Sequence, residues 1–88
     1  KHLTLKIRGK VQGVFFRKSA KKIADMLGVV GWVRNEDDGS VLVETEAEEG
    51  KLEEFLQWAK VGPQGSVVEE VEETWSQEIG GYDGFEVK

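Results

Sequence analysis

The 88-residue sequence predicts an α+β domain in which two helices cover one face of an antiparallel sheet. Two observations support this fold class. Apolar and polar residues alternate in separate short segments, which is the period of half-buried strands. Two other segments repeat their apolar residues at helical spacing, and each lies between two of the strand-like segments. Helices and strands that alternate in this way pack as layers around one core.

The first half of the chain predicts a strand, a helix and a hairpin. Polar and apolar side chains alternate on either side of Leu5, and Gly28 follows the first helical pattern, where a glycine commonly ends a helix. Asp38-Gly39 is a turn dipeptide because glycine accepts a positive φ. The expected elements are a strand over residues 3–8, a helix over 16–27, and strands over 29–34 and 41–46.

The second half predicts a helix, a long strand and a short final strand. The apolar stripe of the helix covers residues 52–59, and Gly62-Pro63 ends it. A strand over 67–75 and a short one over 85–87 follow. No linker or repeat divides the chain, so residues 1–88 form one domain. The order β-α-β-β-α-β, with a short C-terminal strand, is that of the ferredoxin-like split β-α-β sandwich. This fold serves many chemistries and does not by itself define a function.

The composition excludes several functional classes. The chain has no cysteine, which excludes disulfides, thiolate nucleophiles and cysteine-bound metals. No apolar run approaches the roughly 20 residues that span a bilayer, and no signal-peptide pattern is present. The sequence starts at Lys1 without a methionine, so its start could be trimmed. We expect a cytoplasmic, monomeric protein with no membrane partner.

Charge is divided unevenly along the chain. Through Asn35 there are nine Lys and Arg against one acid, whereas the remainder has three lysines and sixteen acids. Positive charge kept near one loop of an acidic protein favours local attraction of a small anion. A nucleic-acid-binding domain would be basic, and the predicted third and fourth strands are rich in glutamate. We therefore expect no nucleic-acid partner.

One glycine-containing loop joins the first strand to the first helix. Gly9 and Gly13 allow the main chain to curl so that successive N–H groups point inward, and such a nest binds anions. Arg17 follows the loop and offers a planar, permanently charged set of donors that fits a phosphate. Taken alone, the segment is equally consistent with a tight connection and a surface arginine.

A second segment, residues 31–41, places Asn35 at the end of a strand and before a turn. An asparagine at this position usually caps its own turn. The two segments together resemble the acylphosphatase family closely. The first matches aliphatic-x-Gly-x-Val-Gln-Gly-Val-x-Phe-Arg from Ile7 to Arg17. The second matches Gly-aromatic-small-x-Asn-x-x-x-Gly-x-Val from Gly31 to Val41, and the resemblance extends over essentially the whole chain.

The resemblance implies an enzyme that hydrolyses the carboxyl-phosphate bond of acyl phosphates to a carboxylate and inorganic phosphate. Arg17 is expected to hold the phosphoryl oxygens and Asn35 to orient the attacking water. The main-chain N–H groups of the loop would complete the phosphate cradle; they belong to Gln12, Gly13, Val14, Phe15 and Phe16. Inorganic phosphate or sulfate is expected to compete as an anion. No cofactor and no metal are expected.

Neighbouring side chains receive less specific interpretations. Gln12 is expected to brace the loop through its side chain, and Phe15 and Phe16 to form core or pocket wall. The three consecutive acids at 36–38 seldom converge on a metal. His2 is expected in a fraying terminus and not as a ligand.

Two alternatives remain open. The chain could be an anion-binding module without catalysis, or an acylphosphatase-like domain excised from a hydrogenase-maturation carbamoyltransferase. The sequence does not identify the physiological acyl group, since the candidate substrates share one phosphoryl head group.

Overall fold

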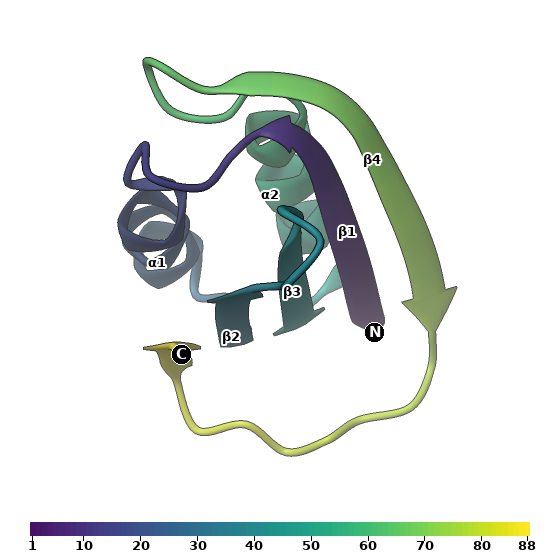
Figure 1. Ribbon diagram of the computed structural model, residues 1–88. Coiled ribbons are helices and arrows are strands. Elements are labelled where there is room, and N and C mark those ends of the chain that lie inside the picture. The colour runs from purple at the N-terminus through teal and green to yellow at the C-terminus, as the bar shows by residue number, and fades with distance from the viewer.

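A computed structural model describes residues 1–88, and its helices and strands follow the expected order (Figure 1). The predicted fold class, a ferredoxin-like α+β sandwich, is confirmed. The elements are β1 (His2–Lys10), α1 (Phe16–Leu27), β2 (Val30–Asn35), β3 (Val41–Glu46), α2 (Glu49–Val61), β4 (Val67–Ser76) and β5 (Phe85–Val87). The first turn of α2 was not predicted because its residues, from Glu49 to Lys51, carry no apolar stripe.

The five strands form one sheet in the order β4-β1-β3-β2-β5. The pairs among β1 to β4 are antiparallel, as predicted. The short strand β5 instead pairs parallel with β2, so an entirely antiparallel sheet was wrong in this detail. A long connection carries the chain from β4, at one edge, to β5 at the other (Figure 1). The last residues of the chain therefore lie beside β2.

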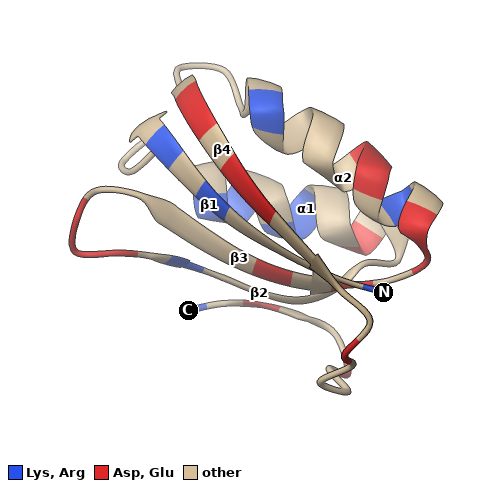
Figure 2. Ribbon diagram, turned by 90° about the vertical axis from the view of Figure 1, so that its right-hand side faces the viewer, with Lys and Arg blue, Asp and Glu red and all other residues tan.

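Both helices pack on the same face of the sheet (Figure 2). The alternation seen in the sequence around Leu5 directs every second side chain of β1 toward them. Burying such apolar surface is the main favourable term in folding. The core contains Leu3, Leu5, Ile7, Val11, Phe16, Ala20, Ala24, Val29, Val33, Val41, Val43, Leu52, Phe55, Leu56, Ala59 and Phe85. The helical layer thereby holds the start of α1 close to the ends of β1 and β2.

Gly31 allows β2 and β3 to approach closely. Its φ is +140°, and a Cβ built on it would lie 1.8 Å from the main-chain oxygen of Glu44. Gly31→Ala should therefore lower the free energy of unfolding by about 3 kcal/mol or more, measured by urea denaturation. Gly50→Ala is the control because no atom lies within 4 Å of a Cβ at that helical position. Equal urea midpoints for the two variants would contradict this packing.

The connection between β4 and β5 is fastened by a charged cluster on the open face of the sheet. The carboxylate of Glu46 accepts hydrogen bonds from the main-chain N–H groups of Gly80 and Gly81. His2 Nδ1 lies 2.9 Å from Glu46 Oε2, and its Nε2 contacts Glu44. Only a doubly protonated imidazole can donate to both carboxylates. His2 is thus part of strand β1 and an ion-pair cluster, and the expected fraying terminus was wrong.

The cluster should make stability depend on pH in two ranges. Burial lowers the pKa of His2, but hydrogen bonds to Glu44 and Glu46 and their charges outweigh it, so its pKa lies above 6.5. Burial raises the pKa of Glu46, but bonds from Gly80, His2 and Gly81 outweigh it and lower that pKa below 4.5. The contribution of His2 to stability is therefore complete when the pH is below the pKa of histidine in the unfolded chain. The contribution of Glu46 is complete when the pH is above the pKa of glutamate in the unfolded chain.

We expect the thermal midpoint to fall as pH rises through the folded pKa of His2, and to fall again as acid protonates Glu46. His2→Gln should abolish the alkaline step, since His2 is the only histidine. It retains the terminal amine, which donates to Ala47 O at 3.1 Å. Midpoints measured from pH 2 to 9 test both steps, and an identical alkaline step in the variant would contradict the role of His2.

Candidate active site

The loop between β1 and α1 presents a row of free main-chain donors. Gly13 has φ +75°, and Phe15, the residue before the helix, has φ +62°. No side chain caps the helix start. The N–H groups from Gln12 to Lys18 donate to no acceptor within the protein. Donors of this kind at the start of a helix attract anions, because the helix dipole adds partial positive charge there.

Arg17 lies in the first turn of α1, beside this row of donors. Its Nη1 donates a hydrogen bond to the main-chain oxygen of Lys88 at 2.9 Å. This bond orients the guanidinium, and no Asp or Glu side chain forms an ion pair with Arg17. Lys and Arg gather on β1 and α1, whereas β4 carries acids (Figure 2). The charge division seen in the sequence thus leaves, at the loop, a guanidinium that no Asp or Glu side chain neutralises.

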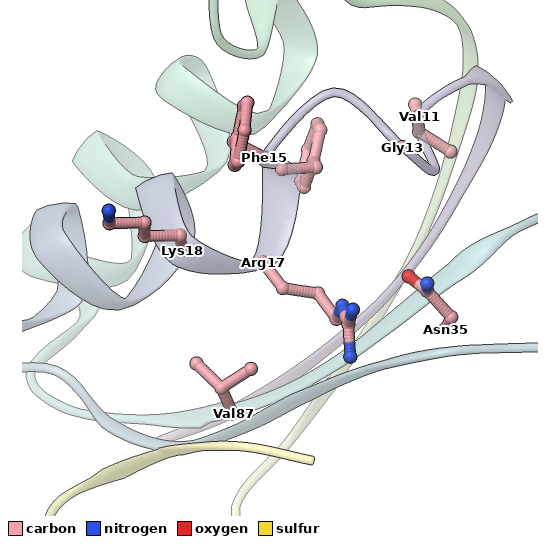
Figure 3. A pocket seen from close by; sticks show the side chains of 8 residues that line it. Val11, Gly13, Phe15, Arg17, Lys18, Asn35 and Val87 are labelled. Carbon is pink, nitrogen blue, oxygen red and sulfur yellow. The ribbon is translucent and has the colours of Figure 1, made fainter.

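Asn35 ends β2, and its side chain faces the guanidinium of Arg17 (Figure 3). The turn that follows is capped by another residue. Ser40 donates to Asp38 Oδ1 from its main-chain N–H at 3.0 Å and from its hydroxyl at 2.5 Å. These two bonds hold the pKa of the Asp38 carboxyl well below its usual range, and the bond from the Ser40 hydroxyl has the larger effect. The amide of Asn35 forms no hydrogen bond within the protein and remains available.

Gln12 connects the loop to the hairpin that follows Asn35. Its Nε2 donates to the main-chain oxygens of Glu36 at 2.8 Å and Ser40 at 2.9 Å. These two bonds span 24 and 28 residues of sequence. They fix the distance between the loop and the end of β2, so the side chain of Gln12 braces the structure.

Arg17 and Asn35 line one cavity of about 280 Å³, which is small for a ligand pocket. Half of the residues that line the cavity are apolar, and the cavity is open to solvent. The full lining is Val11, Gly13, Phe15, Phe16, Arg17, Lys18, Asn35 and Val87. The Lys18 ammonium points away from the guanidinium (Figure 3).

The sequence pattern identified some members of this cavity and not others. The two motifs pointed to the loop, Arg17 and Asn35. Val87 and the carbonyl of Lys88 were missed, because a three-residue strand has no period that indicates its partner. The two neighbouring phenylalanines also separate: Phe16 is buried against Trp58, and Phe15 is exposed.

The structure holds no cluster of three or more His, Cys, Asp or Glu side chains arranged for a metal ion. None of its helices combines the length and the apolar character needed to cross a membrane.

Comparison with known proteins gives one family. The acylphosphatase family model matches residues 3–87. An acylphosphatase of Pyrobaculum islandicum is 49% identical over 84 residues, which cover 94% of this chain and 88% of that protein. The crystal structure of the Bacillus subtilis acylphosphatase superposes with a TM-score of 0.97 at 33% identity, over 99% of this chain and 97% of that one. A full-length HypF structure, in a phosphate- and nucleotide-bound form, matches with a TM-score of 0.87 at 29% identity, but over only 11% of its own length. Two sequence motifs, the fold and these relatives agree, and the chain belongs to the acylphosphatase family.

Proposed function

We propose that this protein hydrolyses acyl phosphates, breaking the bond between phosphorus and the carboxyl oxygen. The observation that carries the proposal is the shared cavity, in which the guanidinium of Arg17 and the free amide of Asn35 face each other beside main-chain N–H groups that have no acceptor within the protein. Family membership supports the same reaction. The substrate class is a small molecule with an acyl phosphate group.

The phosphoryl group would bind between Arg17 and the main-chain N–H groups of residues 12–16. These donors are already oriented, so little reorganisation is needed as charge redistributes in the transition state. Phosphoryl transfer depends mainly on such positioning and charge stabilisation. Inorganic phosphate and sulfate carry the same oxygen geometry and should compete for the site.

Asn35 would orient the water that attacks phosphorus. The new bond joins the water oxygen to phosphorus, and the bond to the carboxyl oxygen breaks with its electron pair, releasing a carboxylate. A carboxylate is a weak base and leaves without a general acid. Because an amide is a poor proton acceptor, the proton of the attacking water passes to an oxygen of the substrate's own phosphoryl group. No metal or cofactor takes part in this scheme.

The direct experiment incubates the purified protein with benzoyl phosphate and follows its loss against the spontaneous rate. Enzymatic loss, with equal amounts of benzoate and phosphate formed, is the expected result. Phosphate binding without hydrolysis would instead identify an anion-binding module. The free amide of Asn35 favours catalysis, because an anion sensor has no need to orient water.

A second candidate is a domain of a larger enzyme, which the match to HypF illustrates. The acylphosphatase of P. islandicum is the better match, with higher identity and with most of its own length covered. We therefore favour the small enzyme. We propose separately that it acts in the cytoplasm as a monomer. Analytical ultracentrifugation of the purified chain tests the monomer directly.

A further inference from the structure

Phe15 combines two unfavourable features that the fold does not require. It is the only residue other than glycine with a positive φ, a conformation that is strained for a bulky side chain. Its side chain is also 76% exposed, more than any other large hydrophobic residue in the chain. A glycine at this position would relieve the strain and expose no apolar surface.

The fold provides no partner for the ring. None of the aromatic pairs in the structure includes Phe15. The pairs are His2 with Tyr82, Phe16 with Trp58, Phe55 with Trp58, and Phe55 with Phe85. Phe16, the next residue, already fills the core position. Residues held in strained backbone conformations cluster at active sites and at places that clamp a ligand. The ring of Phe15 is therefore available to a molecule outside the chain.

The position of Phe15 indicates which molecule that is. Phe15 and Val87 both line the cavity of Arg17 and Asn35, and Val87 is 44% exposed. In Figure 3 the two apolar side chains lie on opposite sides of the Arg17 side chain. The other strongly exposed hydrophobic residues, Met26, Val61, Val67 and Ile79, lie outside the cavity. The cavity thus has a polar part that fits a phosphoryl group and an apolar part beside it.

We infer that Phe15 and Val87 bind the acyl group and select acyl phosphates with a bulky apolar or aromatic acyl chain over those with a short or polar one. The inference rests on the proposed acyl phosphate hydrolysis. An aromatic acyl group stacks on the ring of Phe15 and removes apolar surface of both from water, which an acetyl group does to a much smaller extent. A hydrophobic contact of this size discriminates between substrates by about tenfold.

The test compares kcat/KM for benzoyl phosphate with kcat/KM for acetyl phosphate. In Phe15→Gly the ratio of the two should fall about tenfold, mainly through a higher KM for benzoyl phosphate. Val87→Ala should lower the ratio in the same direction and by less. Met26→Ala removes an equally exposed side chain near the far end of α1 and should leave both the activity and the ratio unchanged.

Phe15→Leu separates binding from a change in loop shape, because it keeps apolar bulk and the same strained backbone. It should retain most of the preference for benzoyl phosphate, whereas Phe15→Gly should lose it and unfold at a temperature no lower than the wild type. The inference would be overturned if the ratio of the two kcat/KM values were the same in the wild type and in Phe15→Gly. This includes the case in which kcat/KM falls by the same factor for both substrates. Either result would leave the proposed hydrolysis intact. A wild-type protein that hydrolyses neither substrate would instead overturn the proposed function.

Discussion

Arg17→Ala is expected to lower kcat/KM for benzoyl phosphate by about 10²-fold or more, a loss of ~3 kcal/mol in transition-state stabilisation. The same variant should bind inorganic phosphate more weakly, because the proposed role of the guanidinium is to hold the phosphoryl oxygens in both the ground state and the transition state. Steady-state kinetics and the inhibition constant of phosphate measure the two effects.

Arg34→Ala is the matched control for this result. Arg34 is an exposed arginine that contacts Glu36 and the ring of Trp32, and it does not line the cavity. Its loss removes the same charge from the chain, so it separates the local role of Arg17 from a general change in net charge. A similar loss of activity in both variants would mean that Arg17 acts only through the long-range field of the protein. Arg17→Lys should recover little, since an ammonium lacks the planar set of donors.

Asn35→Ala is expected to lower kcat by about 10²-fold while the inhibition constant of inorganic phosphate changes little. The difference arises because Asn35 would contact the attacking water, which is absent when phosphate occupies the site. Its amide is not used by the fold, and Asp38 caps the turn, so the variant should also keep its thermal stability.

Gln57→Ala is a suitable control for Asn35→Ala, because it removes an exposed amide from α2, away from the cavity. A normal kcat for Asn35→Ala would show that water is positioned by another group. A weaker affinity for phosphate in parallel with the loss of kcat would instead assign Asn35 to binding of the phosphoryl group.

Periodicity was sufficient to predict most of the fold. The alternation around Leu5 and the apolar stripe of residues 52–59 each repeat several times, so their burial could be read from the pattern. Strand β5 has three residues and no such repeat, and its parallel pairing with β2 could not be predicted. That pairing brings Val87 into the cavity and the Lys88 carbonyl to Arg17. Those parts of the site were therefore missed.

Other features depend on contacts that sequence alone leaves undecided. Phe15 and Phe16 have the same side chain, but Phe15 has a left-handed backbone and is exposed, whereas Phe16 begins α1 and is buried. Both Asn35 and Asp38 can cap a turn, and the hydrogen bonds of Ser40 select Asp38. The interaction of His2 with Glu46 follows from the register of β1 and β3, which places them opposite each other.

The central claim is that the curled loop and Arg17 form one phosphate site that Asn35 shares. Titration of the ¹⁵N-labelled protein with inorganic phosphate, followed by NMR of its amides, tests it most directly. The account predicts the largest shifts at the N–H groups of residues 12–18 and a smaller shift at the side-chain amide of Asn35, which lines the same cavity. The Kd should equal the inhibition constant of phosphate in hydrolysis. Saturable shifts confined to another surface, such as the connection around Gly80 to Gly84, with the loop unaffected, would contradict it.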